Sequence, residues 1–252
     1  MNKFALNHGG GASRSLKAFT LAEVLITLAI IGVVAALTIP SVVTNYQNQE
    51  RAAALKKSVN LLLNTMNHAS IEHGSMNTWD VKNDGGEDFA EKYLTPYLKV
   101  AKRCKDSASG CLHSIQTLNG NTTIDIASTY YIIYFADGTL LGVQPRTSSG
   151  WKAANILIDI NGDKKPNRLG IDAFAFGYVM HDPNGISSGK IITTHDNDRS
   201  YNELFTKGSS ACNKKSDGDT CITAIIKNGW NIPTKDEYKE IVKDLGAYPY
   251  PW

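Results

Sequence analysis

The chain lacks the sequence motifs of the common enzyme classes. Its 252 residues contain no GxxxxGK[ST] phosphate loop, no HExxH zinc motif and no GxGxxG dinucleotide motif. The six histidines are scattered, without the paired spacing of a metal site. An active site assembled from distant residues leaves no such motif, so a membrane-anchored enzyme is kept as a third class. We nevertheless expect a protein that is not an enzyme.

Net charge and cysteine are also scarce. The 26 basic and 24 acidic residues leave a net charge of +2, and no basic stripe stands out, so there is no strong signal for nucleic-acid binding. The four cysteines form two close pairs, Cys104 with Cys111 and Cys212 with Cys221, and neither has the Cys-x-x-Cys spacing of structural zinc sites. In an oxidising compartment, pairing within each couple is the simplest of three disulfide connectivities.

What the chain does have is one long apolar run, from Phe19 to Pro40, interrupted only by the carboxylate of Glu23. At about 1.5 Å per residue a helix of this length spans roughly 30 Å, the hydrocarbon thickness of a bilayer. Basic residues precede it, which predicts a cytoplasmic N-terminal flank and an extracytoplasmic remainder. They are Lys3, Arg14 and Lys17.

The presence of Glu23 in this apolar run requires an explanation, because an acidic residue at the centre of a bilayer costs about 2.5–3.5 kcal/mol on insertion scales. It lies about one turn inside the helix, where water or headgroups can reach it. One interpretation is therefore a tolerated interfacial acid. The other is that Glu23 pairs with a cation, namely an amino terminus newly created at Phe19 of the same or a neighbouring subunit.

The segment Ala18-Phe19-Thr20-Leu21-Ala22-Glu23, followed by the apolar run, resembles the processing site of type IV pilins and type II secretion pseudopilins. The resemblance implies that a prepilin peptidase cleaves between Ala18 and Phe19 and methylates the new amino group of Phe19. It also implies that Glu23 acts in assembly. Ala18 stands where the family usually has glycine.

An ordinary secretory signal peptide is the competing interpretation of the N-terminus. Its apolar region is about 7–15 residues long and ends at a small-residue cleavage site, whereas the run from Phe19 is longer. The two differ in the mature chain, because pilin-type processing begins that chain at Phe19 and retains the apolar helix.

Beyond Pro40 the sequence stays helical, so one helix is expected from Phe19 to about His73, kinked at Pro40. Its second half carries an apolar stripe at helical spacing. The stripe consists of Leu55, Val59, Leu62, Leu63, Met66 and Ala69. The expected divisions are a cytoplasmic leader at 1–18, a transmembrane half-helix at 19–40, an amphipathic half-helix at 41–73 and an extracytoplasmic β-rich domain at 74–252.

Segments rich in β-branched and aromatic residues predict an antiparallel sheet after the long helix. They are 122–127, 130–135, 139–143, 154–160, 174–180 and 190–194. A hairpin turn is expected at 136–138, a short helix or turn within 88–100, and a capped helix from Thr234 and Glu237 to Gly246. Together these features predict an α+β, type IV pilin-like fold: a long kinked N-terminal helix packed on an antiparallel β-sheet, with disulfide-closed C-terminal loops.

A second motif gathers oxygen donors between two predicted strands. Asp159, Asn161 and Asp163, with Asp172 returning from the next segment, have the side chains that a calcium ion prefers. Similar segments occur in pilin-like proteins, and major pseudopilins bind calcium in a comparable region. Asn, Asp and Gly also build tight turns through hydrogen bonds to their own backbone. The sequence leaves both a calcium site and a metal-free turn open, and Ca²⁺ is the only cofactor it suggests.

The leading hypothesis is a structural subunit of a type IV pilus or type II secretion pseudopilus. The alternative is a minor pilin that caps a filament or binds a surface, DNA or a secreted substrate. The resemblance implies as partners the prepilin peptidase, copies of the chain and other pilin-like subunits, an inner-membrane assembly platform and the membrane itself. We expect a single-pass precursor in a bacterial inner membrane that later enters a cell-surface or periplasmic filament.

Overall fold

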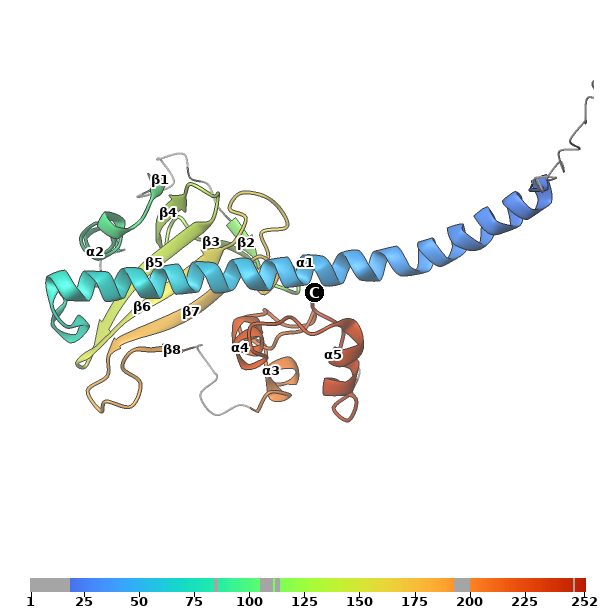
Figure 1. The fold of residues 1–252 in the computed structure, drawn as a ribbon. Helices are drawn as coiled ribbons and strands as arrows, with labels where there is room; N and C mark the ends of the chain where they lie inside the picture. Colours follow the sequence, from blue (N-terminus) through green and yellow to red (C-terminus); the bar gives the residue numbers. More distant parts are fainter. Residues whose placement is uncertain (1–18, 84–85, 105–110, 112–113, 193–199, 247) are drawn as a thin grey trace, which may run out of the picture. The chain divides into compact units, whose positions relative to one another are not determined.

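The structure is a computed structural model that describes residues 19–83, 86–104, 111, 114–192, 200–246 and 248–252. The chain divides into two compact units, one ending at Thr44 and the other running from Asn45 to Trp252. The boundary falls within the first helix, α1, which extends from Leu21 to His73 (Figure 1).

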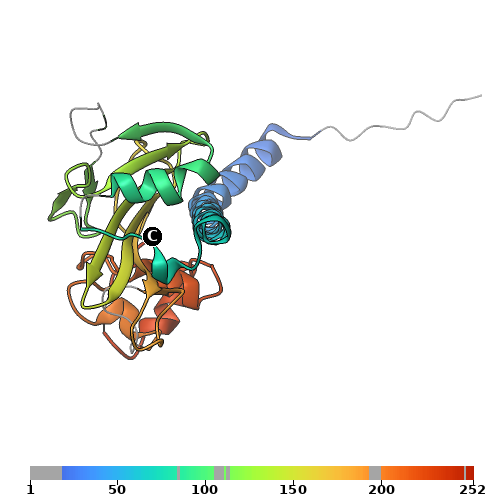
Figure 2. The same cartoon turned by 90° about the vertical axis from the view of Figure 1, so that its left-hand side faces the viewer.

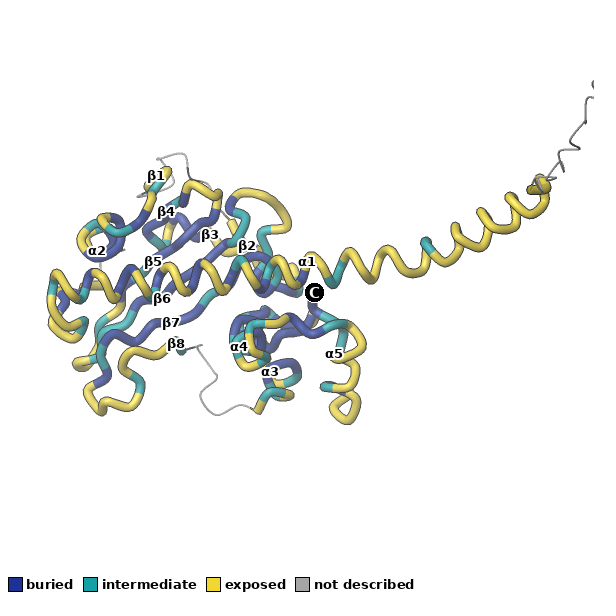
Figure 3. The backbone as a smooth tube through the Cα atoms, in the orientation of Figure 1, coloured by how far each residue is buried: buried dark blue, intermediate teal, exposed yellow. Residues whose placement is uncertain are grey.

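Helix α1 confirms the long helix expected from the sequence, with a start at Leu21 instead of Phe19. Pro40 lies within it, and the expected kink stays a prediction. In the second unit the predicted apolar stripe is buried except at Leu63, which is half-buried. Buried and exposed residues alternate along this half of the helix (Figure 3). Burial of a Val, Leu or Met side chain contributes about 1.5–3 kcal/mol, so the stripe fixes the helix to the core.

The main sheet has six antiparallel strands in the order β1-β4-β5-β6-β7-β8. Their bounds are β1 Val100–Cys104, β4 Tyr131–Phe135, β5 Leu140–Ser148, β6 Trp151–Asp159, β7 Ala173–His181 and β8 Lys190–Ile192. Strands β4 to β8 correspond to predicted strands, and the predicted turn at 136–138 joins β4 to β5. The predicted strand at 122–127 is present as β3 (Thr123–Asp125), but it lies in a separate two-stranded sheet and not in the main sheet. The predicted last strand continued to Thr194, which lies outside the described residues.

The two faces of this sheet pack in two different hydrophobic cores. Residues of one face pack with the stripe of α1 in the main core, and Figure 2 shows α1 on one side of the sheet. They include Ile133, Val143, Ile156, Ile158 and Phe174. Alternate residues form a smaller core under a hairpin of β2 (Ser114–Gln116) and β3 (Thr123–Asp125), as the two-residue period of a strand requires. These are Ile132, Leu140, Leu157 and Ala173.

Short helices precede and follow the sheet. Helix α2 spans Glu87–Tyr93 and confirms the short helix or turn predicted within 88–100. Two 3₁₀ turns lie at Met76–Thr78 and Thr95–Tyr97. After the sheet come α3 (Glu203–Thr206), α4 (Cys221–Lys227) and α5 (Lys235–Val242), which we call the helical lobe, residues 200–246. Only α5 was expected from the sequence.

The predicted capping box of α5 is confirmed. The backbone N–H of Thr234 donates to Glu237 Oε2 at 2.7 Å, and the backbone N–H of Glu237 donates to Thr234 Oγ1 at 3.3 Å. The helix ends at Val242, and Gly246 follows with a positive φ of 107°. A left-handed glycine after a helix is a common stop signal, although here it lies several residues beyond the last helical residue.

Candidate processing and assembly site

Phe19 and Thr20 precede the first turn of α1, and the side chain of Phe19 is 86% exposed. Glu23 Oε2 accepts hydrogen bonds from the backbone N–H and from the hydroxyl of Thr20, both at 2.8 Å. In return, Thr20 Oγ1 accepts one from the backbone N–H of Glu23 at 3.2 Å. This reciprocal pair is a capping box, which satisfies N–H groups that the start of a helix leaves without partners.

The capping box gives Glu23 a local function besides its expected part in assembly. The spacing Thr20-x-x-Glu23 is the sequence signature of such a box, so this contact was readable from the sequence, although only the box at Thr234 was predicted. Ala18 lies outside the described residues. The predicted cleavage site is therefore described only on its Phe19 side.

Within the described part of the chain, α1 is the one helix long and apolar enough to cross a membrane by length and composition. No residue in its most apolar window is buried. Its exposed large side chains include Leu25, Ile26, Leu28, Ile30, Ile31, Val33, Val34, Leu37 and Ile39. A continuous apolar surface of this kind requires cover from lipid or from other protein.

Asp159, Asn161 and Asp172 come together where β6 ends and β7 begins, and both aspartates are buried. Asp172 Oδ1 accepts from the backbone N–H of Arg168 at 2.7 Å, while Oδ2 accepts from that of Asn167 at 3.0 Å and from Asn161 Nδ2 at 3.2 Å. Asp159 Oδ1 accepts from the backbone N–H of Asn161 at 3.1 Å. These carboxylates therefore hold the turn together through its own backbone.

The fourth predicted calcium ligand, Asp163, is exposed, and its Oδ1 accepts from the hydroxyl of Tyr134 at 2.7 Å. Burial raises the pKa of Tyr134, and the hydrogen bond to Asp163 raises this pKa further. One observation favours an ion: Asn161 Oδ1 is buried without a hydrogen-bond partner. Against it, the described residues contain no group of three or more His, Cys, Asp or Glu side chains that could hold a metal. Calcium binding stays a prediction.

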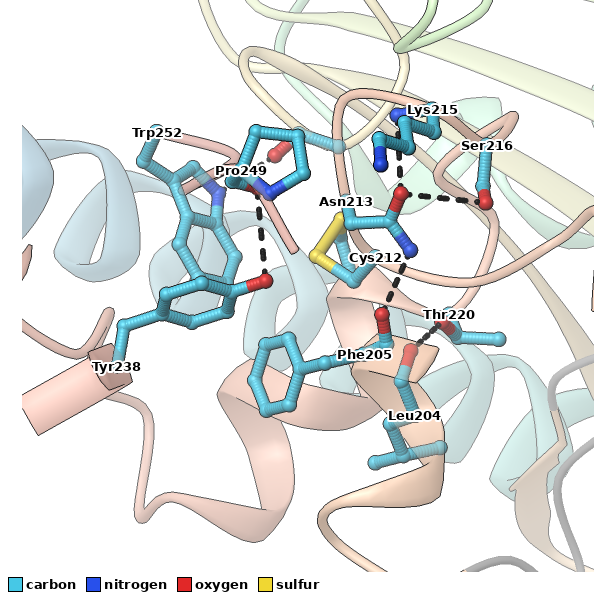
Figure 4. The surroundings of a disulfide bond; sticks show 12 residues. Leu204, Phe205, Cys212, Asn213, Lys215, Ser216, Thr220, Tyr238, Pro249 and Trp252 are labelled. Atoms are coloured by element: carbon cyan, nitrogen blue, oxygen red, sulfur yellow. Dashed lines mark hydrogen bonds between the residues drawn. A yellow bond between two sulfur atoms is a disulfide. The ribbon is translucent and has the colours of Figure 1, made fainter. Parts of the chain in front are cut away.

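Both cysteine couples form disulfides, one joining Cys104 to Cys111 and the other joining Cys212 to Cys221. The first follows β1, and the segment 105–110 that it closes lies outside the described residues. The second lies in the helical lobe, where both cysteines are buried. Figure 4 shows Cys212 beside Phe205 and Trp252. Disulfides persist in oxidising compartments, which is consistent with a domain outside the cytoplasm.

An apolar cavity of about 260 Å³ lies between the main sheet and the β2–β3 hairpin. Aliphatic side chains such as Ile115, Ile126 and Leu157 form most of its wall. Its polar lining residues are Tyr130, Asn155 and Asp219, and the described lining includes no Ser, Cys, His or Lys.

Two family models match the chain. Residues 14–39 match the prokaryotic N-terminal methylation motif, which confirms the resemblance to type IV pilin and pseudopilin precursors. Residues 41–239 match a family described as a family of unknown function (DUF6613). No curated relative and no solved structure gives a significant match.

Proposed function

We propose that this chain, which belongs to the family of unknown function (DUF6613), is a structural subunit of a type IV pilus or type II secretion pseudopilus. The observation that carries the proposal is the methylation motif at residues 14–39, which lies in register with the start of α1 and its exposed apolar surface. A prepilin peptidase would cleave between Ala18 and Phe19 and methylate the amino group of Phe19. The role is structural and not catalytic.

The proposed precursor spans the bacterial inner membrane once. Residues 1–18 are the cytoplasmic leader, 19–40 the spanning half-helix, 41–73 the amphipathic half-helix and 74–252 the extracytoplasmic domain. The exposed side chains between Leu25 and Ile39 support this topology, because lipid supplies the cover they need. The two disulfides support an oxidising location for the domain.

Assembly moves α1 from lipid to contact with other copies of α1 or with α1-like helices. Because both surroundings are apolar, this transfer gains little hydrophobic free energy, and charge pairing must favour the correct arrangement. The Glu23 carboxylate is exposed at the start of the helix and carries the negative charge that such a pair needs. We assign its partner as the cationic amino group of Phe19 on a neighbouring subunit, a pair that is strong in a low-dielectric setting.

Three variants separate the charge of Glu23 from its capping function. Glu23→Ala removes both, Glu23→Gln keeps a side-chain oxygen for the Thr20 N–H but removes the charge, and Thr20→Ala keeps the charge but removes the hydroxyl. We expect all three precursors to enter the membrane and to be cleaved. Membrane fractionation and the mass of the mature chain measure these two steps. Filament yield after shearing should fall strongly in both Glu23 variants and much less in Thr20→Ala.

Normal filaments from Glu23→Ala would contradict a part for this residue in assembly. Normal filaments from Glu23→Gln, with none from Glu23→Ala, would show that the cap matters and the charge does not. Failure of Glu23→Gln to insert or to be cleaved would place its defect before assembly and remove the charge-pair argument.

The same preparations distinguish a major from a minor subunit. A major subunit dominates sheared filaments, whereas a minor pilin that caps a filament or binds a surface, DNA or a secreted substrate is scarce in them. Quantitative mass spectrometry of the filament fraction gives the ratio of this chain to the other pilin-like subunits. We propose the major role, and a ratio far below one would assign the minor role instead.

A further inference from the structure

The C-terminal residues 248–252, which we call the tail, form no helix or strand, yet they contact parts of the chain that are distant in sequence. The hydroxyl of Tyr250 donates to the carbonyl oxygen of Pro233 at 2.7 Å and accepts from Asn48 Nδ2, on α1, at 2.9 Å. Trp252 Nε1 donates to the carbonyl oxygen of Gly170, between β6 and β7, at 2.7 Å. The tail therefore connects α1, the turn after β6 and the segment before α5.

Aromatic rings continue this connection into the helical lobe. Phe205 of α3 meets Trp252 edge-on with ring centroids 6.2 Å apart, and it meets Tyr238 of α5 in the same way at 5.3 Å. Tyr250 lies edge-on to Tyr238 at 5.5 Å and to Trp252 at 6.0 Å. Figure 4 shows Phe205, Tyr238 and Trp252 gathered beside Cys212. Edge-to-face pairs of this kind are favourable beyond the area that they bury.

Asn48 is the anchor of the tail on α1. It is only 2% exposed, and its Oδ1 accepts a hydrogen bond from Arg51 Nη1 at 3.2 Å while its Nδ2 donates to Tyr250. A buried amide is costly unless it is hydrogen-bonded, so the position of Tyr250 is coupled to that of the helix.

The helical lobe has little local stability of its own. Its helices have 4, 7 and 8 residues, well below the roughly 12–15 that an isolated helix needs in water. The disulfide loop holds α3 in place, since Asn213 Nδ2 donates to the carbonyl of Phe205 at 2.6 Å and Thr220 Oγ1 to that of Leu204 at 2.7 Å. These contacts lie within the lobe, whereas the contacts of the tail join the lobe to α1 and to the turn after β6. The lobe is also joined to the segment after β2, because the backbone N–H groups of Leu118 and Asn119 donate to the carbonyl oxygens of Asp217 and Ser216 at 2.8 and 3.0 Å.

We propose that the tail is a strap that closes the helical lobe onto α1 and the turn after β6, and that its release opens the lobe while the sheet stays folded. On the lobe, the strap is held by the ring contacts of Tyr250 with Tyr238 and of Trp252 with Phe205. On α1 and the turn after β6, it is held by the hydrogen bonds with Asn48 and Gly170. The lobe is thus positioned relative to the helix by residues at the opposite end of the sequence.

Hydrogen exchange of the full chain in detergent micelles tests this proposal. Tyr250→Phe keeps the ring but removes both hydroxyl hydrogen bonds, and Trp252→Ala removes a ring and one hydrogen bond. Amides of α4 and α5 should exchange about tenfold faster in Tyr250→Phe and faster still in Trp252→Ala. Amides of β5, β6 and β7 should keep their wild-type rates.

Tyr248→Phe is the matched control, because the Tyr248 hydroxyl makes no hydrogen bond among the described residues, and it should change neither set of amides. Equal acceleration of the lobe and the sheet would overturn the proposal, since the tail would then belong to one cooperative unit. Unchanged lobe exchange in Tyr250→Phe would overturn it as well. If Trp252→Ala does not fold, the milder Tyr250→Phe decides. The measurement uses unassembled chain, so its outcome does not depend on the proposed function.

Discussion

Replacing Asp172 tests whether the turn between β6 and β7 is held by its buried carboxylate. Asp172 is 1% exposed and accepts two backbone N–H groups, from Asn167 and Arg168, and one side-chain amide. Asp172→Ala leaves these donors without their acceptor. An unsatisfied buried donor costs about 1–3 kcal/mol, so the two backbone groups alone predict a loss of about 2–6 kcal/mol. That is a large share of the roughly 5–15 kcal/mol that stabilises a typical domain.

The free energy of unfolding from urea titration, followed by tryptophan fluorescence, measures this loss. Asp172→Asn keeps one acceptor oxygen and should lose less than Asp172→Ala. Asp163→Ala is the matched control, because Asp163 is exposed and accepts from Tyr134 at the surface, so we expect a loss of about 1 kcal/mol at most. Equal stability of wild type and Asp172→Ala would refute the reasoning, because the carboxylate would then contribute nothing to the turn.

Calcium binding is tested by thermal melting of the wild type and of Asp159→Ala. If the turn is free of metal, the melting temperature of the wild type is the same with calcium and with a chelator. If an ion binds, calcium raises the melting temperature, and Asp159→Ala removes the rise. The two interpretations of the Asp159–Asp172 segment thus give opposite results in one titration.

Three further changes follow from the packing and turns. Leu55→Ala should lower the free energy of unfolding by about 2–5 kcal/mol because Leu55 is fully buried. Leu61 lies on the same helix but is 38% exposed, so Leu61→Ala should lower it by under about 1 kcal/mol. Similar losses in the two variants would contradict the assignment of the buried face. Gly162→Ala should destabilise more than Gly185→Ala, since both glycines have positive φ but a Cβ at 162 collides with the carbonyl oxygen of Gly138, and equal melting temperatures would contradict this. Thr234→Ala should cost about 0.5–2 kcal/mol by urea titration through loss of the α5 cap, and no change would show that the cap is dispensable.

Long, regular patterns made much of the fold predictable. The stripe from Leu55 to Ala69 repeats over several turns, so its period identifies a helix without ambiguity. Strands β4 to β7 are rich in β-branched and aromatic residues and are separated by recognisable turns. The start of α1 was predicted within two residues.

The missed elements are short or carry ambiguous patterns. Strand β1 reads Val-Ala-Lys-Arg-Cys and is mostly exposed at the edge of the sheet, so it lacks the alternation of a half-buried strand. Helix α4 is a short apolar run, which periodicity cannot distinguish from a buried strand. The contact of Asn48 with Tyr250 joins residues 202 positions apart, and no local pattern specifies such a pair.

The parts of the candidate site whose residues lie close together in the sequence were predictable, and the parts that depend on the folded chain were not. Phe19, Thr20 and Glu23 lie within one helical turn, and their order in the sequence fixes both the processing motif and the capping box. The Asp159–Asp172 segment was recognised as a cluster of oxygen donors. Its hydrogen-bond partners were not predictable, because they depend on how the chain folds between the two strands.

The most direct test of the central claim is the N-terminus and mass of the chain purified from its native membrane or filaments. N-terminal sequencing and intact mass spectrometry should give a chain that starts at N-methylated Phe19 and keeps the apolar half of α1. A chain that begins downstream of Pro40, or one that still carries residues 1–18, would contradict the account.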